Sequence, residues 1–171
     1  SSGGIFHSGA VRAPGAQQST IADAQLMDML AVASNMDSLA FRLQNMNMDP
    51  NGVENGDRWA AVLQAAAAAA NWKPWVSGSG AAAQTGDIRK GRGIAMSHHG
   101  GGFAASVADI SVNIKTGKIT VDHVWAAQDS GLVVNPNLVE NQMIGSTIQG
   151  LSRVLYRSEE HTSELQSRLH L

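Results

Sequence analysis

The stretch that decides the fold is GRGIAMSHHGGGFAASVADISVNIKTGKITVDHVW, residues 91–125. Two runs of β-branched residues stand on either side of Thr116-Gly117, and such residues are enriched in strands. Glycine readily adopts the positive φ that a tight turn between two strands needs. The segment therefore predicts a β-hairpin. Its apolar strand positions are Val107, Ile110, Val112 and Ile114 before the turn, and Ile119, Val121 and Val124 after it.

The segment that follows, DSGLVVNPNLVENQMIGSTIQG at residues 129–150, predicts a turn and then a helix. Pro136 favours an extended or turn conformation at Asn135 and has the fixed φ that suits a helix start. The first N–H groups of such a helix have no partners within it, so they favour an anionic ligand. Gln142 and Gly145 are three residues apart and share one face, which glycine would leave open to a large ligand. A capped core helix with closely packed glycines is the alternative.

Two helices are predicted in the first quarter of the chain. Ser19 or Thr20 can cap the first helix. Asp37 can cap the second, which ends near Met46, and we expect Arg42 within it to be solvated or salt-bridged. Three-and-four spacing marks a core-facing side of the first helix. Its apolar positions are Leu26, Met27, Leu30, Ala31 and Ala33.

A third helix is predicted after an exposed loop at residues 47–56, which is dense in Asn, Asp, Gly and Pro. Residues 77–91 are predicted to form another loop, which joins the helical and sheet halves. The fold class is therefore α+β, with a helical part at 8–76 and a hairpin plus a C-terminal helix within 92–156. The apolar stripe of the third helix is Trp59, Val62, Leu63 and Ala66.

The cluster His98-His99-Gly100-Gly101-Gly102-Phe103 invites a metal interpretation, together with His123 and Asp129. Adjacent histidines on a strand point to opposite faces, and no paired helical spacing such as HExxH is present. We therefore predict no metal ligands here. The glycines are predicted to let the strand approach a ligand or a neighbouring segment, with His99 or Phe103 lining a cleft.

Composition narrows the function classes. The 171 residues carry a net charge of −2, with 43% hydrophobic and 15% charged residues, which predicts a globular core. This balance gives no footprint for nucleic acid, and no run of about 18 apolar residues is present to cross a membrane. The chain contains no cysteine, so it cannot ligate an iron–sulfur cluster through thiolates. It does not begin with Met and lacks a secretory signal, so we expect it to be truncated at its beginning.

The last residues, RSEEHTSELQSRLHL at 157–171, differ in composition from the helix before them. Arg157–Ser167 resembles the translation of a sequencing-library adapter, read in frame after a coding sequence cut near Tyr156. A solvated helix is the alternative, since Leu165 and Leu169 could form an amphipathic turn. We expect the tail to be non-native and exclude it from the prediction of fold and function.

Two motifs together resemble the molybdenum hydroxylases, the xanthine dehydrogenase and aldehyde oxidase family. The segment SGAVRAPGAQQSTIADAQLMDMLAVASNMDSLAFRLQNM, residues 8–46, resembles the arginine-glycine motif and the two helices behind it. The other motif is the pattern G-x-x-V-N-P-x-x-x-x-x-Q-x-x-G-x-x-x-Q-G-L. Here it reads Gly131, Val134, Asn135, Pro136, Gln142, Gly145, Gln149, Gly150 and Leu151.

The resemblance extends to other parts of the chain. The Val-Leu and double-Ala segment before Asn71-Trp72 resembles the family, as do the Gly-Arg-Gly-Ile-Ala opening and the Val-Ala-x-x-Ser-Val strand of the hairpin. Together the matched pieces span nearly all of residues 8–156. The chain is most similar to the bacterial isoquinoline 1-oxidoreductase type of large subunit.

The resemblance implies that residues 1–156 form part of a molybdopterin-binding domain of an oxidoreductase. Such enzymes hydroxylate aromatic N-heterocycles or aldehydes with oxygen from water. The implied cofactor is the cytosine dinucleotide form of molybdopterin, with the iron–sulfur clusters on a small partner subunit. Pro14 replaces the aromatic residue of eukaryotic xanthine-oxidising members, which argues against purine. The implied cofactor-binding residues are Arg12, Ala10, Val11, Gln142 and Gly145.

The family's catalytic glutamate lies in a downstream Gly-x-Gly-Glu motif that has no match in this chain. We therefore predict no catalytic residue here and no activity of the chain alone. Two other function classes stay open from the residues themselves. One is a non-catalytic α+β interaction module, and the other is a histidine-based zinc hydrolase.

Overall fold

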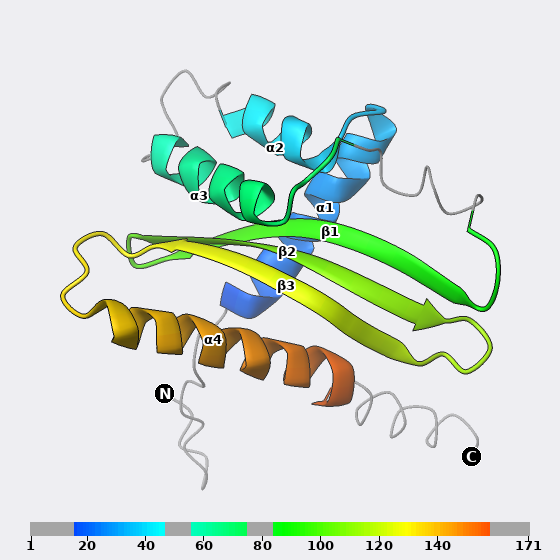
Figure 1. Cartoon of the computed structure of the whole chain (residues 1–171). Coiled ribbons are helices and arrows are strands. Elements are labelled where there is room, and N and C mark those ends of the chain that lie inside the picture. Colours follow the sequence, from blue (N-terminus) through cyan, green and yellow to red (C-terminus); the bar gives the residue numbers. More distant parts are fainter. Residues whose placement is uncertain (1–15, 47–55, 75–83, 158–171) are drawn as a thin grey trace, which may run out of the picture.

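The computed structural model describes residues 16–46, 56–74 and 84–157. Three strands, β1 (Ile88–His99), β2 (Gly102–Asn113) and β3 (Ile119–Asp129), form one antiparallel sheet in that order. The helices before the sheet are α1 (Ala16–Ala33), α2 (Ser38–Met46) and α3 (Gly56–Ala69). After it come α4 (Pro136–Ser152) and a short π-helix, η2 (Arg153–Arg157). This arrangement confirms the predicted α+β class (Figure 1).

The predicted hairpin is confirmed as the pairing of β2 with β3. Val112 pairs with Ile119, and Gly117 in the turn has a φ of 71°. The loop predicted at 77–91 is wrong at its end, because β1 already begins at Ile88. There the backbone pairs with Asn113 of β2, so sheet hydrogen bonding overrides the polar composition of this stretch.

A second hairpin joins β1 to β2, and it corrects the prediction for the histidine and glycine cluster. Gly100 and Gly101 form the turn with φ values of 56° and 80°, the positive pair that a two-residue turn requires. A methyl group built on either glycine would meet no atom of the described residues within 4 Å, so neither serves a close approach to them. Phe103 is 4% exposed and belongs to the core, so it does not line a cleft.

The core lies between α3 and one face of the sheet. Leu63 of α3 and Val107 of β2 are completely buried, and Trp59 packs edge-on against the Phe103 ring at 5.4 Å between ring centroids. The predicted stripe of the third helix is therefore confirmed. The buried hydrophobic residues of this core are Met46, Val62, Leu63, Ala66, Ala67, Ala70, Ile94, Phe103, Ala105 and Val107.

α1 differs from its prediction in two respects. It begins at Ala16, so neither Ser19 nor Thr20 is its cap. Among the predicted core positions Ala31 is buried, whereas Leu26 and Leu30 are 56% and 44% exposed. Periodicity identifies an apolar face, but burial also needs an opposing surface, and the described residues cover Ala31 while leaving Leu26 and Leu30 exposed.

α2 confirms the predicted cap, because Oδ2 of Asp37 accepts a hydrogen bond from the Ala40 N–H at 2.9 Å. Oδ1 of Asp37 also accepts one from the indole N–H of Trp72 at 3.0 Å. Arg42 is salt-bridged to Asp28 at 2.8 Å as predicted, but its side chain is only 1% exposed and not solvated. The salt-bridged alternative is therefore confirmed, and the arginine lies in the interior.

The two faces of the sheet are covered differently. Figure 1 shows α2 and α3 on one side of the sheet and α4 on the other. None of the residues of α4 is buried. Within the described residues, no helix is both long and apolar enough to cross a membrane.

Candidate functional site

The start of α4 has the geometry that the sequence predicted. Asn135 is extended, with φ −133° and ψ 100°, and Pro136 opens the helix. The Asn135 side-chain oxygen accepts a hydrogen bond from the Leu138 N–H at 3.1 Å, which satisfies one of the donors at this end. The other early N–H groups contribute the positive end of the helix dipole.

Gln142 and Gly145 lie on the side of α4 that faces away from the sheet. Both residues are exposed, as are their neighbours Leu138 and Ile148 at 61% and 62%. A methyl group built on Gly145 would meet no atom of the described residues within 4 Å. An amide beside an open glycine on an exposed face is compatible with a large, hydrogen-bonding cofactor.

The other predicted site residues, Arg12, Ala10 and Val11, lie outside the described residues. α1 begins at Ala16, so the helix that follows their motif can be located. Thr20 in α1 and Thr147 in α4 line the same cavity of about 260 Å³. The two motifs are far apart in the sequence, but the helices that carry or follow them approach each other here.

The floor of this cavity is made of small side chains from all three strands. On β2, Ala104 and Ser106 face it, whereas Phe103 and Val107 belong to the core on the opposite face. Small residues leave room between α4 and the sheet. The remaining cavity-lining residues are Ala95, Met96, Ser97, Ala105, Ala126, Ala127, Gln128, Met143 and Ser146.

Arg42 ties α1 to the sheet beside a second cavity of about 340 Å³, which also reaches Thr20 and His98. Its Nη2 donates hydrogen bonds to the Ala24 carbonyl at 3.1 Å, to Asp28 at 2.8 Å and to the Ile94 carbonyl at 3.3 Å. Burial lowers the pKa of Arg42, and the nearby Asp28 opposes this shift. The Nε atom of Arg42 is buried without a hydrogen-bond partner.

Sequence reasoning missed the burial of Arg42, although a signal was present. Arg42 falls on the same helical face as Leu39, Leu43 and Met46, all of which contribute to the core or pack against it. Arginine is almost never fully buried unless it is paired, so its place within an apolar stripe was the signal for a buried ion pair.

Arg58 and Asp129 form a second pair, which the sequence did not indicate. Nε and Nη2 of Arg58 each donate a hydrogen bond of 2.7 Å to the Asp129 carboxylate. The carboxylate also accepts the Gly131 N–H at 2.8 Å. These hydrogen bonds lower the pKa of Asp129 to about 2, and those from Arg58 make the largest contribution. Asp129 is therefore held as an anion, with both of its carboxylate oxygens bonded to Arg58.

The zinc interpretation finds no ligand set in the described part of the chain. No group of three or more His, Cys, Asp or Glu side chains gathers there. His98 instead lies against Trp59, with 4.9 Å between ring centroids, and His123 stacks on Trp125 at 5.4 Å.

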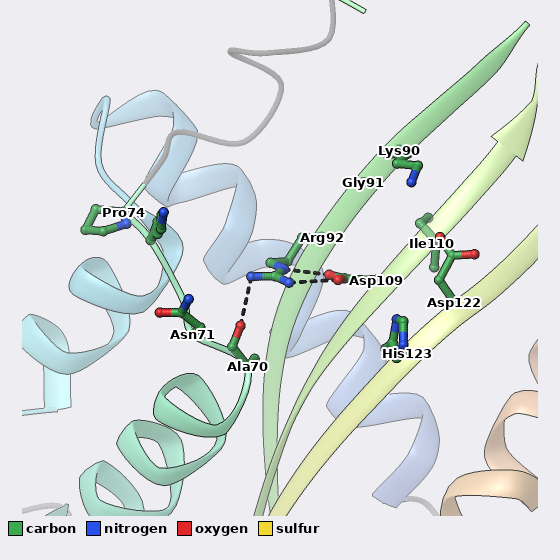
Figure 2. A pocket seen from close by; sticks show the side chains of 11 residues that line it. Ala70, Asn71, Pro74, Lys90, Gly91, Arg92, Asp109, Ile110, Asp122 and His123 are labelled. Atoms are coloured by element: carbon green, nitrogen blue, oxygen red, sulfur yellow. Dashed lines mark hydrogen bonds and ion pairs between the residues drawn. The ribbon is translucent and has the colours of Figure 1, made fainter.

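A third cavity, of about 1050 Å³ and larger than the two above, lies between the end of α3 and the strands (Figure 2). Figure 2 shows Arg92 at its centre, paired with Asp109 and bonded to the Ala70 carbonyl at 3.0 Å. The hydrogen bonds from Arg92 to the Asp109 carboxylate lower the pKa of Asp109. None of the predicted site residues that the structure describes lines this cavity, and its central charges neutralise each other. Size alone therefore does not make it the functional site.

Comparison with known proteins decides between the function classes. The family model of the molybdopterin cofactor-binding domain matches residues 15–166. The chain belongs to this family. Membership confirms the predicted family, so α4 with Gln142 and Gly145 is part of a molybdopterin-binding domain.

Two relatives match this molybdopterin-binding chain over 85% of its length. One is a nicotinate dehydrogenase subunit from Pseudomonas putida, 32% identical over 153 residues. The other is the beta subunit of isoquinoline 1-oxidoreductase from Brevundimonas diminuta, 31% identical over 145 residues. The chain spans only 12% and 17% of these two proteins. A probable hypoxanthine oxidase of Escherichia coli matches 38% of the chain at 33% identity and 8% of its own length.

Proposed function

We propose that this domain forms part of the large subunit of a molybdenum hydroxylase and holds the cofactor against the outward face of α4. The observation that carries the proposal is the exposed pair of Gln142 and Gly145, where no described residue comes within 4 Å of a methyl group built on Gly145. An apolar core helix would instead bury this face. α1 and α4 also border one cavity on the sheet-facing side of α4, so the helices that follow and carry the two motifs lie near each other.

Each residue of the proposed site has a distinct role in binding. Gln142 donates and accepts hydrogen bonds with the edge of the pterin, and Gly145 removes steric hindrance to it. Arg12 offers a planar fork of donors to oxygen or sulfur atoms near the metal, with the backbone of Ala10 and Val11 alongside. When bound, the molybdenum cofactor supplies the two-electron oxidation chemistry of the enzyme. The residues of this chain bind and orient it.

The proposed substrates are aromatic N-heterocycles, with aldehydes as the second class. The names of the two relatives that match most of the chain include nicotinate and isoquinoline, both aromatic N-heterocycles. Pro14 cannot offer the aromatic face that would stack on a purine, so we propose a substrate other than purine.

We propose that electrons pass from the molybdenum centre to another polypeptide. The chain has no cysteine to ligate an iron–sulfur cluster, and both relatives are named as subunits. We therefore propose an iron–sulfur small subunit as partner and the cytosine dinucleotide form of the pterin. The general base is proposed to lie outside this chain, so the isolated chain should show no turnover above background.

The experiment that tests the proposal is cofactor retention in the complete large subunit, purified with its partner. Gln142→Leu and Gly145→Leu should lower molybdenum and pterin per subunit at least about tenfold, since a missing polar partner or a blocked face typically costs over 1.4 kcal/mol. Glu140→Leu is the control, because this exposed residue lies on the flank of the same helix. Full cofactor content in both site variants would contradict the proposal. Zinc without molybdenum in the wild type would favour the hydrolase.

A further inference from the structure

The segment that leads into α4 is tied to the sheet through Asp129, the last residue of β3. Oδ1 of Asp129 accepts a hydrogen bond from the Gly131 N–H at 2.8 Å. Gly131 has a φ of 71°, in the left-handed region that glycine adopts without strain. This bond therefore helps to set the direction in which the chain leaves the sheet.

Asp129 is itself oriented by a rigid part of the fold. Arg58, in the first turn of α3, donates two hydrogen bonds of 2.7 Å to the two carboxylate oxygens. The Arg58 guanidinium lies over the Phe103 ring, 4.7 Å from its centroid, and Phe103 is buried in the core. A two-point contact between planar groups fixes the carboxylate in rotation as well as in distance.

α4 has little apolar packing of its own to fix its position. None of its residues is buried, and the side that faces the sheet borders the 260 Å³ cavity. The position of a helix with so little buried area depends strongly on how its connecting segment is anchored.

We propose that Arg58 and Asp129 are a positioning pair, which sets where α4 stands over the sheet and thereby where Gln142 and Gly145 meet the cofactor. This inference rests on the proposed function. Neither residue is proposed to touch the cofactor. They act through the Gly131 backbone, since Asp129 links the rigid α3 end of the core to the segment that carries the cofactor helix.

The chain contains a matched control pair. Arg92 and Asp109 also form a two-point ion pair, with distances of 2.5 and 2.7 Å, and Arg92 lies 5.4 Å from the Trp125 ring centroid. The two pairs have similar exposure. The side chains of Arg58 and Asp129 are 34% and 31% exposed, and those of Arg92 and Asp109 are 29% and 25% exposed. Arg92 bonds to the Ala70 carbonyl after the end of α3, whereas Arg58 is at the start of that helix. Only the Arg58 pair bonds to the segment before α4.

The first measurement is hydrogen–deuterium exchange of the 171-residue chain. Arg58→Gln and Asp129→Asn should raise exchange over residues 131–152 about twofold to fivefold, the range for a partly exposed ion pair. Asp129→Ala should raise it further, because it also removes the acceptor for the Gly131 N–H. Arg92→Gln should leave exchange in this range unchanged. Wild-type exchange of residues 131–152 in both Arg58→Gln and Asp129→Ala would overturn the inference.

The second measurement separates positioning from general stability. In the complete subunit purified with its partner, Arg58→Gln should retain several-fold less molybdenum than Arg92→Gln at equal melting temperature. Equal retention by the two variants would mean that the Arg58 pair is only structural, and the inference would fail while the proposed function stands. If the wild-type subunit carries no molybdenum, the proposed function itself fails and the inference falls with it.

Discussion

The two faces of the three-stranded sheet use the same strands for opposite purposes. Toward α3, β2 presents Phe103 and Val107, which are 4% and 0% exposed, and toward α4 it presents Ala104 and Ser106, which are half-buried. The first face builds a core, and the second leaves a cavity under a helix with no buried residue. Alternation along one strand thus gives one face that stabilises the fold and another that leaves space under α4.

The largest expected effect is in the core. Leu63→Ala, at a fully buried position of α3, should lower the free energy of unfolding by about 2–5 kcal/mol, through lost burial and the cavity left behind. Leu138→Ala on α4, where the side chain is 61% exposed, should change it by less than about 0.5 kcal/mol. Urea unfolding followed by circular dichroism gives both values. Equal losses would mean that the two faces do not differ as described.

The buried ion pair between α1 and α2 should have the next largest effect. Asp28→Asn leaves the Arg42 charge without its carboxylate partner and should lower the free energy of unfolding by about 1–3 kcal/mol. Asp23→Asn is the control, because Asp23 is exposed on the same helix. The same unfolding experiment measures both variants. A loss from Asp23→Asn as large as that from Asp28→Asn would assign the effect to helix charge and not to the pair.

A smaller effect, a stabilisation, is expected in α4 on the other side of the sheet. Gly145→Ala should stabilise α4 by about 0.5–1 kcal/mol, since alanine is the better helix former and its methyl group meets no neighbour. Helix content and amide exchange of α4 in the isolated chain are the measurements. A loss of helix would show that Gly145 is packed against something, contrary to an open face.

The smallest expected effect is on the stability of the fold at acidic pH. Arg58 holds the pKa of Asp129 at about 2, below its ordinary value of 3.8, so the pair stabilises the fold fully above that ordinary value. This contribution is lost as the pH falls from about 4 toward 2. Carboxyl carbon NMR should show Asp129 titrating near pH 2 in the wild type and closer to 3.8 in Arg58→Gln. Identical titration in both proteins would contradict the pairing.

The elements that the sequence predicted best are those with local causes. The turn at Gly117, the Asp37 cap, the Asn135-Pro136 helix start and the stripe of α3 each follow from residues a few positions apart. The buried Arg42 and the Arg58 pair were missed because their partners lie far away in the sequence, at Ile94 and Asp129.

The sequence by itself determined the family, the α+β class and the choice of the residues that we propose for the cofactor. These depend on motif order and local chemistry, which are written along the chain. Only the tertiary structure decided which face of the sheet is filled, that Leu26 and Leu30 stay exposed, and that Asp129 is paired with Arg58. Burial and ion pairing depend on which distant segments meet, and no local pattern specifies that.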